Sequence, residues 1–452
     1  MKKGLVVLLI LSLSQFLAEA QVANNTSLVG TVTDASGSVV VGAHVTAVNA
    51  DTNVPYDAIT NAEGFYSITG QINPGTFNVT VEQRGFQKEL KTGVIVTLNE
   101  AARTDFVLKV GSATTEVTIS ASTPTIQTDD ALLGETVTET LIANLPMNGR
   151  NALALANIAS NVTVGTGQAL TGVPPGITAS GAGTRGVNNE ITLDGISIMN
   201  NLGSTVTLQP NPDALEAVQT QNGNYSAQSG DYLGIHINQA TMAGTNSFHG
   251  TVYDYLQNDA FNSRGFNTSA VIPKKAELRY NIFGGVVSGP VLIPHLYNGR
   301  NRTFFMGSYE GLRTHSSTPA YTQAFTTAEE NGDFSALLNT AITGAAKPIV
   351  LFSPFDGHSY YNPATGTQII NDQPAANAPI VKNILSYAAL ANVTAPGTLL
   401  SGNNLATSTS LTNENSTVDR IDQTIGQKIR LFGRFDWQQV NGVSVSREYV
   451  NN

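Results

Sequence analysis

Residues 428–439 constrain the fold more than any other stretch, because their side chains alternate between apolar and polar. Successive side chains of a β-strand point to opposite faces, so this stretch forms one apolar and one charged face, with Phe432 as the exception. A lipid-exposed barrel strand ending in an aromatic girdle requires this pattern. A strand of a soluble sandwich gives the same alternation, and that alternative stays open. The apolar face comprises Ile429, Leu431, Gly433, Phe435 and Trp437, and the polar face Lys428, Arg430, Arg434, Asp436 and Gln438.

The composition favours a chain of many strands and turns. Charged residues make up only 12% of the 452 residues, about half their usual share in soluble proteins, and 42 residues are glycine. The hydrophobic fraction of 41% is large enough to bury a core, so the low charge does not indicate disorder. The length leaves room for two or three domains. We therefore expect a mainly β protein.

Several kinds of chemistry find no support in the sequence. The net charge of −10 leaves no basic surface for nucleic acid. The absence of cysteine excludes a disulfide framework, a cysteine-ligated metal and a thiol nucleophile. The six histidines show no pairing at a helical spacing of four, and no set of catalytic residues is assembled. We therefore predict no enzyme activity, no catalytic residue, no cofactor and no metal site.

The first twenty residues are typical of a secretory signal. Lys2 and Lys3 precede an apolar run from Leu5 to Leu17, and residues 18–20 supply a small-x-small cleavage site. The run is shorter than the ~20 residues that a membrane-spanning helix needs. We expect export, with cleavage between Ala20 and Gln21.

Residues 21–110 have the pattern of a small β-sandwich. Short apolar runs alternate with turn clusters rich in Gly, Asn and Asp, which favour tight turns. Residues 77–82 alternate strictly, so one face of that strand should be buried. Residues 30–34, Gly64-Phe65-Tyr66 and Pro74-Gly75 resemble the carboxypeptidase regulatory-like, transthyretin-like domain. That resemblance implies a fold and not peptidase activity, and we expect a structural or contact module that folds by itself.

Residues 141–244 carry motifs that occur together, in order, in one family. They are Asn148-Gly149-Arg150, Arg185-Gly186, Asp194-Gly195 within a hairpin, and an acidic segment at residues 213–218. With Thr245 to Gly250, they resemble the plug domain of Oar-like TonB-dependent outer-membrane receptors. The resemblance implies an α+β plug that fills a barrel. For Arg185 and Asp194 we favour capping or pairing within the plug over contact with a ligand.

The linker at residues 111–140 contains an extended run that is similar to a TonB box. The resemblance implies that the TonB energy-coupling complex is the partner, engaging the run by strand addition through the main chain. Such pairing constrains composition loosely, so the last strand of the sandwich, or a plain linker, explains the run equally well. The run consists of Glu116, Val117, Thr118, Ile119 and Ser120.

Residues 245–452 are expected to supply the first four to five strands of an incomplete antiparallel outer-membrane barrel. The early strands are 247–258, 279–290 and 302–313, and residues 428–439 follow. Asn441-Gly442 is a strong hairpin signal. Residues 314–427 are expected to form a long extracellular loop, since barrels place long loops outside. Four to five strands cannot close into a barrel in lipid. We therefore expect this chain to be the front part of a longer receptor.

The expected function is capture of an extracellular ligand and its import with energy from the inner membrane. Within the long loop, aromatic side chains stand beside hydrogen-bonding groups, an arrangement that suits carbohydrate or peptide contact. Packing of the loop on its own barrel explains the same residues, and we favour that reading. The candidate contacts are Phe355, Tyr360 and Tyr361. The alternative function is a soluble, secreted, β-rich adhesin or glycan-binding protein.

Overall fold

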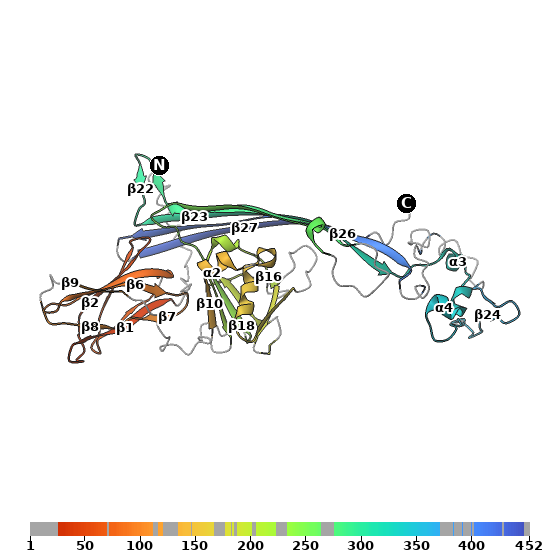
Figure 1. The fold of residues 1–452 in the computed structure, drawn as a ribbon, viewed down its shortest axis with the longest axis horizontal. Helices are drawn as coiled ribbons and strands as arrows, with labels where there is room; N and C mark the ends of the chain where they lie inside the picture. Colours follow the sequence, from red (N-terminus) through yellow and green to blue (C-terminus); the bar gives the residue numbers. More distant parts are fainter. Residues whose placement is uncertain are drawn as a thin grey trace, which may run out of the picture. The chain divides into compact units, whose positions relative to one another are not determined.

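The computed structural model describes residues 26–446, apart from 70–71, 112–115, 121–133, 146, 167–176, 182, 185–187, 201–204, 223–232, 264–274, 371–382, 384–390, 392–398, 400–401 and 427–428. The predicted secretory signal therefore lies outside the described residues. Within them the chain is mainly β, as predicted (Figure 1). No described helix is long and apolar enough to cross a membrane. Contacts divide the chain into two compact units, and the first contains the described residues up to Tyr253 together with Gly284–Glu310 and Asn415–Gln439.

The amino-terminal domain is a sandwich of two sheets. One has the order β4–β1–β7, with β8 also paired to β1, and the other has the order β3–β2–β5–β6–β9. The predicted alternation along β5 is confirmed, because Phe77, Val79 and Val81 are fully buried. The strands are β1 Ser27–Asp34, β2 His44–Asn49, β3 Pro55–Ile59, β4 Phe65–Ile68, β5 Gly75–Glu82, β6 Lys88–Val96, β7 Ala101–Arg103, β8 Phe106–Leu108 and β9 Glu116–Ser120.

Close backbone approach fixes one glycine of the sandwich. A Cβ atom at Gly30 would lie 2.0 Å from the carbonyl oxygen of Thr104, far inside van der Waals contact. The same carbonyl accepts a 2.6 Å hydrogen bond from the hydroxyl of Tyr66, which is buried. Only glycine lets β1 lie this close to the connection between its partner strands β7 and β8, and this explains part of the Gly30-Thr31 motif.

The structure places the candidate TonB box in the sandwich. Strand β9 pairs in parallel with β6, with Lys88 opposite Glu116 and Thr92 opposite Ser120. This is the last-strand alternative that the sequence left open, and it carries the second sheet beyond Val110. Strand β9 lies at the end of that sheet, and no described strand pairs with its outer edge.

Strands between residues 134 and 241 form a further sheet of five strands, in the order β10–β17–β18–β13–β14. We call residues 141–244 the plug segment. Strand β13 runs parallel to β18, and the hairpin predicted around Asp194-Gly195 is present as β13–β14. The elements are β10 Gly134–Thr138, α2 Glu139–Asn144, β11 Val162–Thr166, β12 Ile177–Gly181, β13 Glu190–Leu193, β14 Ile196–Ser197, β15 Met199–Asn200, β16 Thr205–Val206, β17 Leu215–Asn222 and β18 Ile235–Thr241, with 3₁₀ helices η1 Asn148–Arg150, η2 Ala152–Ile158 and η4 Pro212–Ala214.

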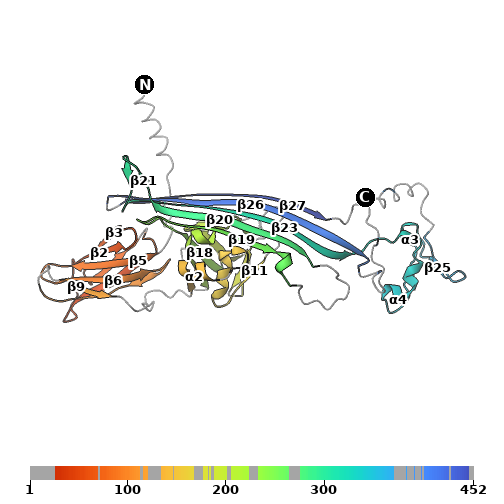
Figure 2. The same cartoon turned by 45° about the horizontal axis from the view of Figure 1, so that its top comes forward.

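Five long strands lie side by side in the order β19–β20–β23–β26–β27 (Figure 2). We call them the barrel sheet. Cross-strand hydrogen bonds join Thr303 to Gln423 and Ser308 to Val418, so β23 and β26 are antiparallel. The elements from here on are β19 His249–Asn258, η6 Asp259–Phe261, β20 Glu277–Pro290, β21 Leu292–Ile293, β22 Tyr297–Asn298, β23 Thr303–Thr322, α3 Thr327–Glu330, η7 Ser335–Leu338, α4 Thr340–Thr343, β24 Tyr361–Asn362, β25 Thr367–Gln368, β26 Asn404–Ile425 and β27 Ile429–Ser446.

The two faces of β27 are those that the sequence predicted. The apolar residues of the alternating stretch are exposed, Phe435 by 62%, whereas the intervening residues are half-buried. Phe432 lies on the polar side, where its ring packs 4.9 Å from the guanidinium carbon of Arg420. The stacked arginine explains why one aromatic residue occupies the polar face.

Strand β26 overturns the predicted loop at residues 314–427. Strand β23 continues to Thr322 and β26 begins at Asn404, so the excursion between them comprises residues 323–403 and is shorter than predicted. Strand β26 reads as a loop because Glu414, Ser416 and Arg420, which alternate with outward residues, are polar yet buried. The positions between them, such as Asn413, Asn415 and Asp419, are polar as well, so this part of β26 lacks the apolar–polar alternation that marks β27.

Two related predictions are also wrong. Asn441-Gly442 lies inside β27 and makes no hairpin, whereas the chain reverses after Ile425, where Gly426 has a φ of 63°. The Asn-Gly signal presupposes that a strand ends there, and β27 does not. Because β26 lies between β23 and β27, those two strands run in the same direction, whereas the predicted loop at residues 314–427 would have made them antiparallel neighbours.

Candidate functional site

The site begins with the tight turn between β13 and β14. Asp194 and Gly195 have φ values of 49° and 78°, the left-handed conformation that a two-residue hairpin requires at both positions. The amide of Asp194 donates a 2.8 Å hydrogen bond to the carbonyl of Gln239, which fixes the turn against β18. The turn therefore directs the Asp194 carboxylate away from the solvent, and its side chain is 1% exposed.

Within the plug segment, the carboxylate is held by one residue. Thr241 donates to it twice, from its amide to Oδ1 at 2.9 Å and from its hydroxyl to Oδ2 at 2.7 Å. These bonds join the β13–β14 turn to the end of β18. Asp194 thus pairs within the plug segment, but this pairing leaves its negative charge uncompensated.

Two arginines of the barrel sheet compensate that charge. Arg434 of β27 donates to Oδ2 at 2.7 Å and also to the carbonyl of Leu193 at 2.6 Å. Arg420 of β26 lies 3.5 Å from Oδ1 and donates to the carbonyl of Thr241 at 3.0 Å. Both arginine side chains are only 6% exposed, so solvent screens these pairs little. We call Asp194, Arg420 and Arg434 the latch.

Each latch arginine also has a carboxylate on its own strand. Arg420 donates two hydrogen bonds to Asp422, at 2.8 and 2.9 Å, in the two-pronged geometry that suits a guanidinium. Arg434 donates to Asp436 at 2.8 Å. Residues two apart on a strand share a face, so each strand presents a preassembled ion pair to the plug segment. The arrangement positions the arginines, and each of them shares its charge between the carboxylate on its own strand and Asp194.

A second cluster of charged residues joins the plug segment to two other strands of the barrel sheet, β19 and β23. Arg150, from the Asn-Gly-Arg motif, contacts Asp213 at 3.1 Å and Glu310 of β23 at 3.5 Å. Its guanidinium carbon stands 4.1 Å above the ring of Tyr253 on β19, and the Tyr253 hydroxyl donates to Glu310 at 2.7 Å. The polarity is reversed relative to the latch, because here the plug segment supplies the arginine. Buried charged residues therefore attach the plug segment to β26 and β27 at one place and to β19 and β23 at another.

One plug-segment carboxyl has an unusual proton affinity. Glu216 occupies the bulge of β17 and is half-buried. Burial raises the pKa of Glu216 to about 8; Arg420 opposes that rise, and the nearby carboxylates of Glu139, Asp194 and Asp422 add to it. The folded protein therefore binds this proton more tightly than the unfolded chain, in which a glutamate titrates near ~4.3.

This proton makes the stability of the plug segment depend on pH. The contribution of Glu216 is present in full below about pH 4.3 and is lost as the pH rises through about 8, because the charged carboxylate is then buried. Amide exchange in β17 and β18, corrected for intrinsic rates, should therefore accelerate between about pH 5 and 9. Glu216→Gln should flatten that profile. A profile that is unchanged in Glu216→Gln would assign the pH dependence to another group.

The structure brings together few of the residues that the sequence singled out. Asp194 belongs to the latch and Gly195 completes its turn, whereas Arg185 and Gly186 lie outside the described residues. In the excursion between β23 and β26, Phe355 is 81% exposed and Tyr361 39% exposed. Tyr360 is half-buried, and its ring packs edge-on against His358 at 4.9 Å. Among the described residues, no group of three potential ligands could hold a metal.

Sequence reasoning missed both latch arginines, although a signal for them exists. Arg420-Ile421-Asp422 on β26 and Arg434-Phe435-Asp436 on β27 repeat an Arg-apolar-Asp triplet on neighbouring strands. In each triplet the apolar residue faces outward and is exposed, while the two charges face inward. In this chain the triplet marks a strand that buries an ion pair on one face and exposes an apolar residue on the other.

Comparison with known proteins agrees with this architecture. Residues 240–448 match an outer membrane beta barrel domain, and residues 27–109 match a carboxypeptidase regulatory-like domain. The TonB-dependent transporter Oar of Myxococcus xanthus is 25% identical over 346 residues, which cover 73% of this chain and 31% of Oar. The chain thus spans about a third of the length of this curated relative.

Solved structures of two receptors are also similar. The siderophore receptor PiuA of Acinetobacter baumannii is 14% identical, with 69% of this chain and 37% of PiuA covered and a TM-score of 0.32. The siderophore receptor PirA of Pseudomonas aeruginosa is 13% identical, with 71% and 42% covered and a TM-score of 0.29. The barrel family supports an outer-membrane location. The chain therefore carries a carboxypeptidase regulatory-like domain at residues 27–109 and matches an outer membrane beta barrel domain over residues 240–448, and it is similar to the TonB-dependent transporter Oar.

Proposed function

We propose that this chain acts in a TonB-dependent outer-membrane transporter, in which the plug segment closes the barrel until TonB displaces it. The observation that carries the proposal is the latch. Asp194 of the plug segment is held by arginines from two neighbouring barrel strands, so the contact is buried, directional and broken when the plug segment moves. Import would then draw its energy from the inner membrane, since the described residues assemble no group for bond-breaking chemistry.

Export to the outer membrane requires a signal, and we propose that residues 1–20 supply it, as the sequence predicted. Lipid would then contact the apolar face of β27, whose exposed side chains include Leu431 and Trp437. Amino-terminal sequencing of the mature receptor should begin at Gln21. Retention of Met1 in the mature protein would refute the cleavage.

We further propose that Glu116–Ser120 is the TonB box. Its backbone is already extended as β9, at the end of its sheet, and its outer edge pairs with no described strand. An edge strand offers unpaired main-chain donors and acceptors to another strand. TonB would add a strand there, at a position in the chain that leads directly into the plug segment.

Site-directed crosslinking tests the proposal. Because this sequence contains no cysteine, each disulfide can be assigned to the introduced residue. A receptor with Thr118→Cys should form a disulfide with a set of single-cysteine TonB variants, and ligand-bearing cells should give more of the product. The control is Val107→Cys, at a 54% exposed position on β8 of the opposite sheet. Equal crosslinking at both positions, or none at Thr118, would show that TonB engages another segment.

For the ligand, we propose an oligosaccharide or peptide bound by aromatic side chains of the excursion between β23 and β26. Phe355 and Tyr361 expose their rings among polar neighbours, an arrangement in which an aromatic face can stack while adjacent groups donate hydrogen bonds. Vesicles carrying the receptor should retain components of an oligosaccharide or peptide mixture. Phe355→Ala should weaken that retention, and unchanged retention would place the binding surface elsewhere.

A further inference from the structure

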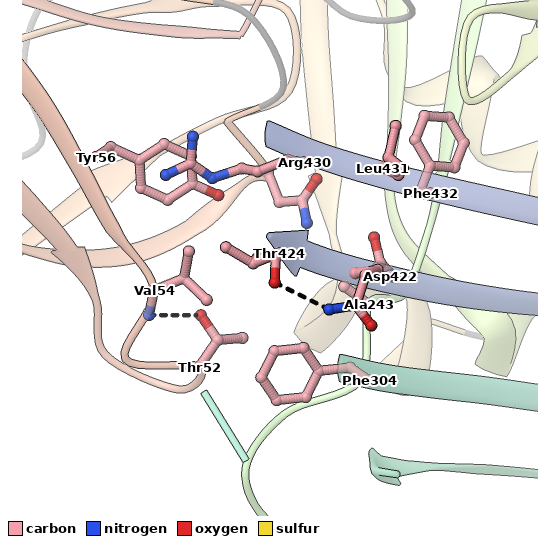
Figure 3. Close-up of a pocket in the computed structure, with 13 residues that line it drawn as sticks. Thr52, Val54, Tyr56, Ala243, Phe304, Asp422, Thr424, Arg430, Leu431 and Phe432 are labelled. Carbon is pink, nitrogen blue, oxygen red and sulfur yellow. Dashed lines mark hydrogen bonds between the residues drawn. The ribbon is translucent and has the colours of Figure 1, made fainter. Parts of the chain in front are cut away.

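The sandwich is docked on the barrel sheet by a stacked arginine. The guanidinium carbon of Arg430, on β27, stands 3.8 Å from the ring centroid of Tyr56 on β3, and Arg430 also donates to the carbonyl of Pro55 (Figure 3). Phe304 of β23 belongs to the same apolar cluster as the sandwich core. A groove lined by Val54, Tyr56, Phe304, Arg430 and other residues marks this junction.

Turn residues extend the docking. The turn between β2 and β3 meets the segment that leads into β19, because the carbonyl of Asp51 accepts a 3.1 Å hydrogen bond from the amide of Asn246. The side chain of Asn53 donates to that of Asn301 at 3.4 Å. The contact therefore combines apolar packing, a cation over an aromatic ring and main-chain hydrogen bonds, which together define one docked position.

The sandwich also contacts the plug segment directly. Leu98, in the turn after β6, is fully buried against Ala217 and Ala240 of β17 and β18. Its carbonyl accepts a 2.8 Å hydrogen bond from the side chain of Gln219. Glu100 accepts a 3.2 Å bond from Thr136 of β10. The sandwich is thus attached to the barrel sheet at one place and to the plug sheet at another.

The two attachments meet at Arg420. One guanidinium nitrogen of Arg420 faces Asp194 and Thr241 of the plug segment, and the other lies 3.4 Å from the side-chain oxygen of Asn73 in the sandwich. A single buried side chain is thus shared by the barrel sheet, the plug segment and the sandwich. Movement of the sandwich must change the surroundings of a latch residue.

We propose that the docked sandwich holds the latch closed, so that undocking of the sandwich loosens the plug segment. This inference rests on the proposed plug function and adds the regulation of that site. In the chain, β9 of the sandwich is followed by β10, the first strand of the plug sheet. A force that TonB applies to β9 would therefore act on the sandwich as well as on the plug sheet. Coupling of this kind is reciprocal, since whatever favours the docked sandwich favours the closed latch by the same free energy.

Hydrogen exchange in the receptor measures the coupling without any ligand. Arg430 contacts the sandwich through Tyr56 and Pro55, so Arg430→Ala removes a docking contact and leaves the latch residues in place. We expect amides of residues 190–198 and 235–242 to exchange about fivefold faster, as the loss of one partly exposed cation–ring contact implies. Faster exchange confined to residues 44–59, with the plug segment unchanged, would overturn the proposal.

The chain offers a matched control. Arg302 also stacks on a tyrosine, 5.1 Å from the ring centroid of Tyr297, and also donates to a carbonyl, that of Asn298. Its side-chain contacts are local to the hairpin of β21 and β22 and do not reach the sandwich. Arg302→Ala should therefore leave exchange in the plug segment unchanged, and equal acceleration in both variants would show a general loss of stability and overturn the coupling.

A crosslink supplies the reverse experiment. Asn53→Cys with Asn301→Cys, joined by a short bismaleimide, ties the sandwich to the barrel sheet in a chain that has no other cysteine. In the Arg430→Ala background the crosslink should return plug-segment exchange to its original rate, and the single-cysteine variants should not. Fast exchange that persists in the crosslinked receptor would contradict the proposal. Crosslinking of TonB at Thr118 is scored separately, so failure of the coupling and failure of the proposed function remain distinguishable.

Discussion

Asp194→Ala should destabilise the plug segment by about 3–5 kcal/mol, the largest effect that we expect from a single charged residue. Thr241 would lose the acceptor for both its amide and its hydroxyl, and Arg434 and Arg420 would lose their plug partner, all in surroundings that exclude water. The measurement is amide exchange of β13 and β18 in the intact receptor. An acceleration of exchange that corresponds to less than about 1 kcal/mol would show that the latch contributes little.

The control for this variant is an exposed acidic residue. Glu82 pairs with Lys88 at 3.1 Å on the sandwich surface, where the carboxylate side chain is 56% exposed. Such pairs contribute about 0–1 kcal/mol, so Glu82→Ala should leave exchange in β13 and β18 unchanged. If both variants accelerate exchange equally, the effect does not arise from burial of the latch.

Phe106→Ala should destabilise the sandwich by about 3–5 kcal/mol, which is a large part of the stability of a small domain. Phe106 is fully buried in the sandwich core and packs against Tyr66, with ring centroids 6.4 Å apart. The neighbouring Val107, on the same strand, is 54% exposed, so Val107→Ala is the matched control and should change stability little. Thermal unfolding of separately expressed residues 21–120 compares the two variants.

That experiment also tests whether the sandwich folds alone. Apart from Phe304, every buried member of its core cluster lies between Leu28 and Leu108, so most of the core is internal. We therefore expect a cooperative transition for the separately expressed sandwich, provided that β9 is included. A disordered circular-dichroism spectrum of that fragment would show that docking on the barrel sheet and plug segment is required for folding.

The sequence predicted the elements whose two faces differ in polarity. The faces of β27, the buried face of β5 and the Asp194-Gly195 hairpin follow from side-chain alternation and turn chemistry, which are local properties. Strand β26 was missed because residues on both of its faces are polar around Glu414, and the inward Arg420 is buried by charge pairing with Asp422 and Asp194. Such burial depends on partners elsewhere in the chain, and local patterns carry no record of them.

The candidate site shows the same division. Asp194 could be singled out from its place in an Asp-Gly turn, but its partners come from strands more than 200 residues away in the sequence. The Asn441-Gly442 signal failed for the complementary reason, because the register of β27 against β26 overrides a local preference for a turn. Long-range pairing decides both cases.

Under the proposed transport function, the carboxylates that pair with the latch arginines on their own strands bear on how often the plug segment can leave and return. When the plug segment leaves, Arg420 keeps Asp422 and Arg434 keeps Asp436, so the wall of the channel retains no unbalanced positive charge. Water can then hydrate the donors that Asp194 has vacated, unlike in the Asp194→Ala variant, where they stay buried. Opening should therefore cost less than deletion, an anionic cargo should not be trapped on the wall, and the emptied site should remain ready to receive the same carboxylate in the next transport cycle.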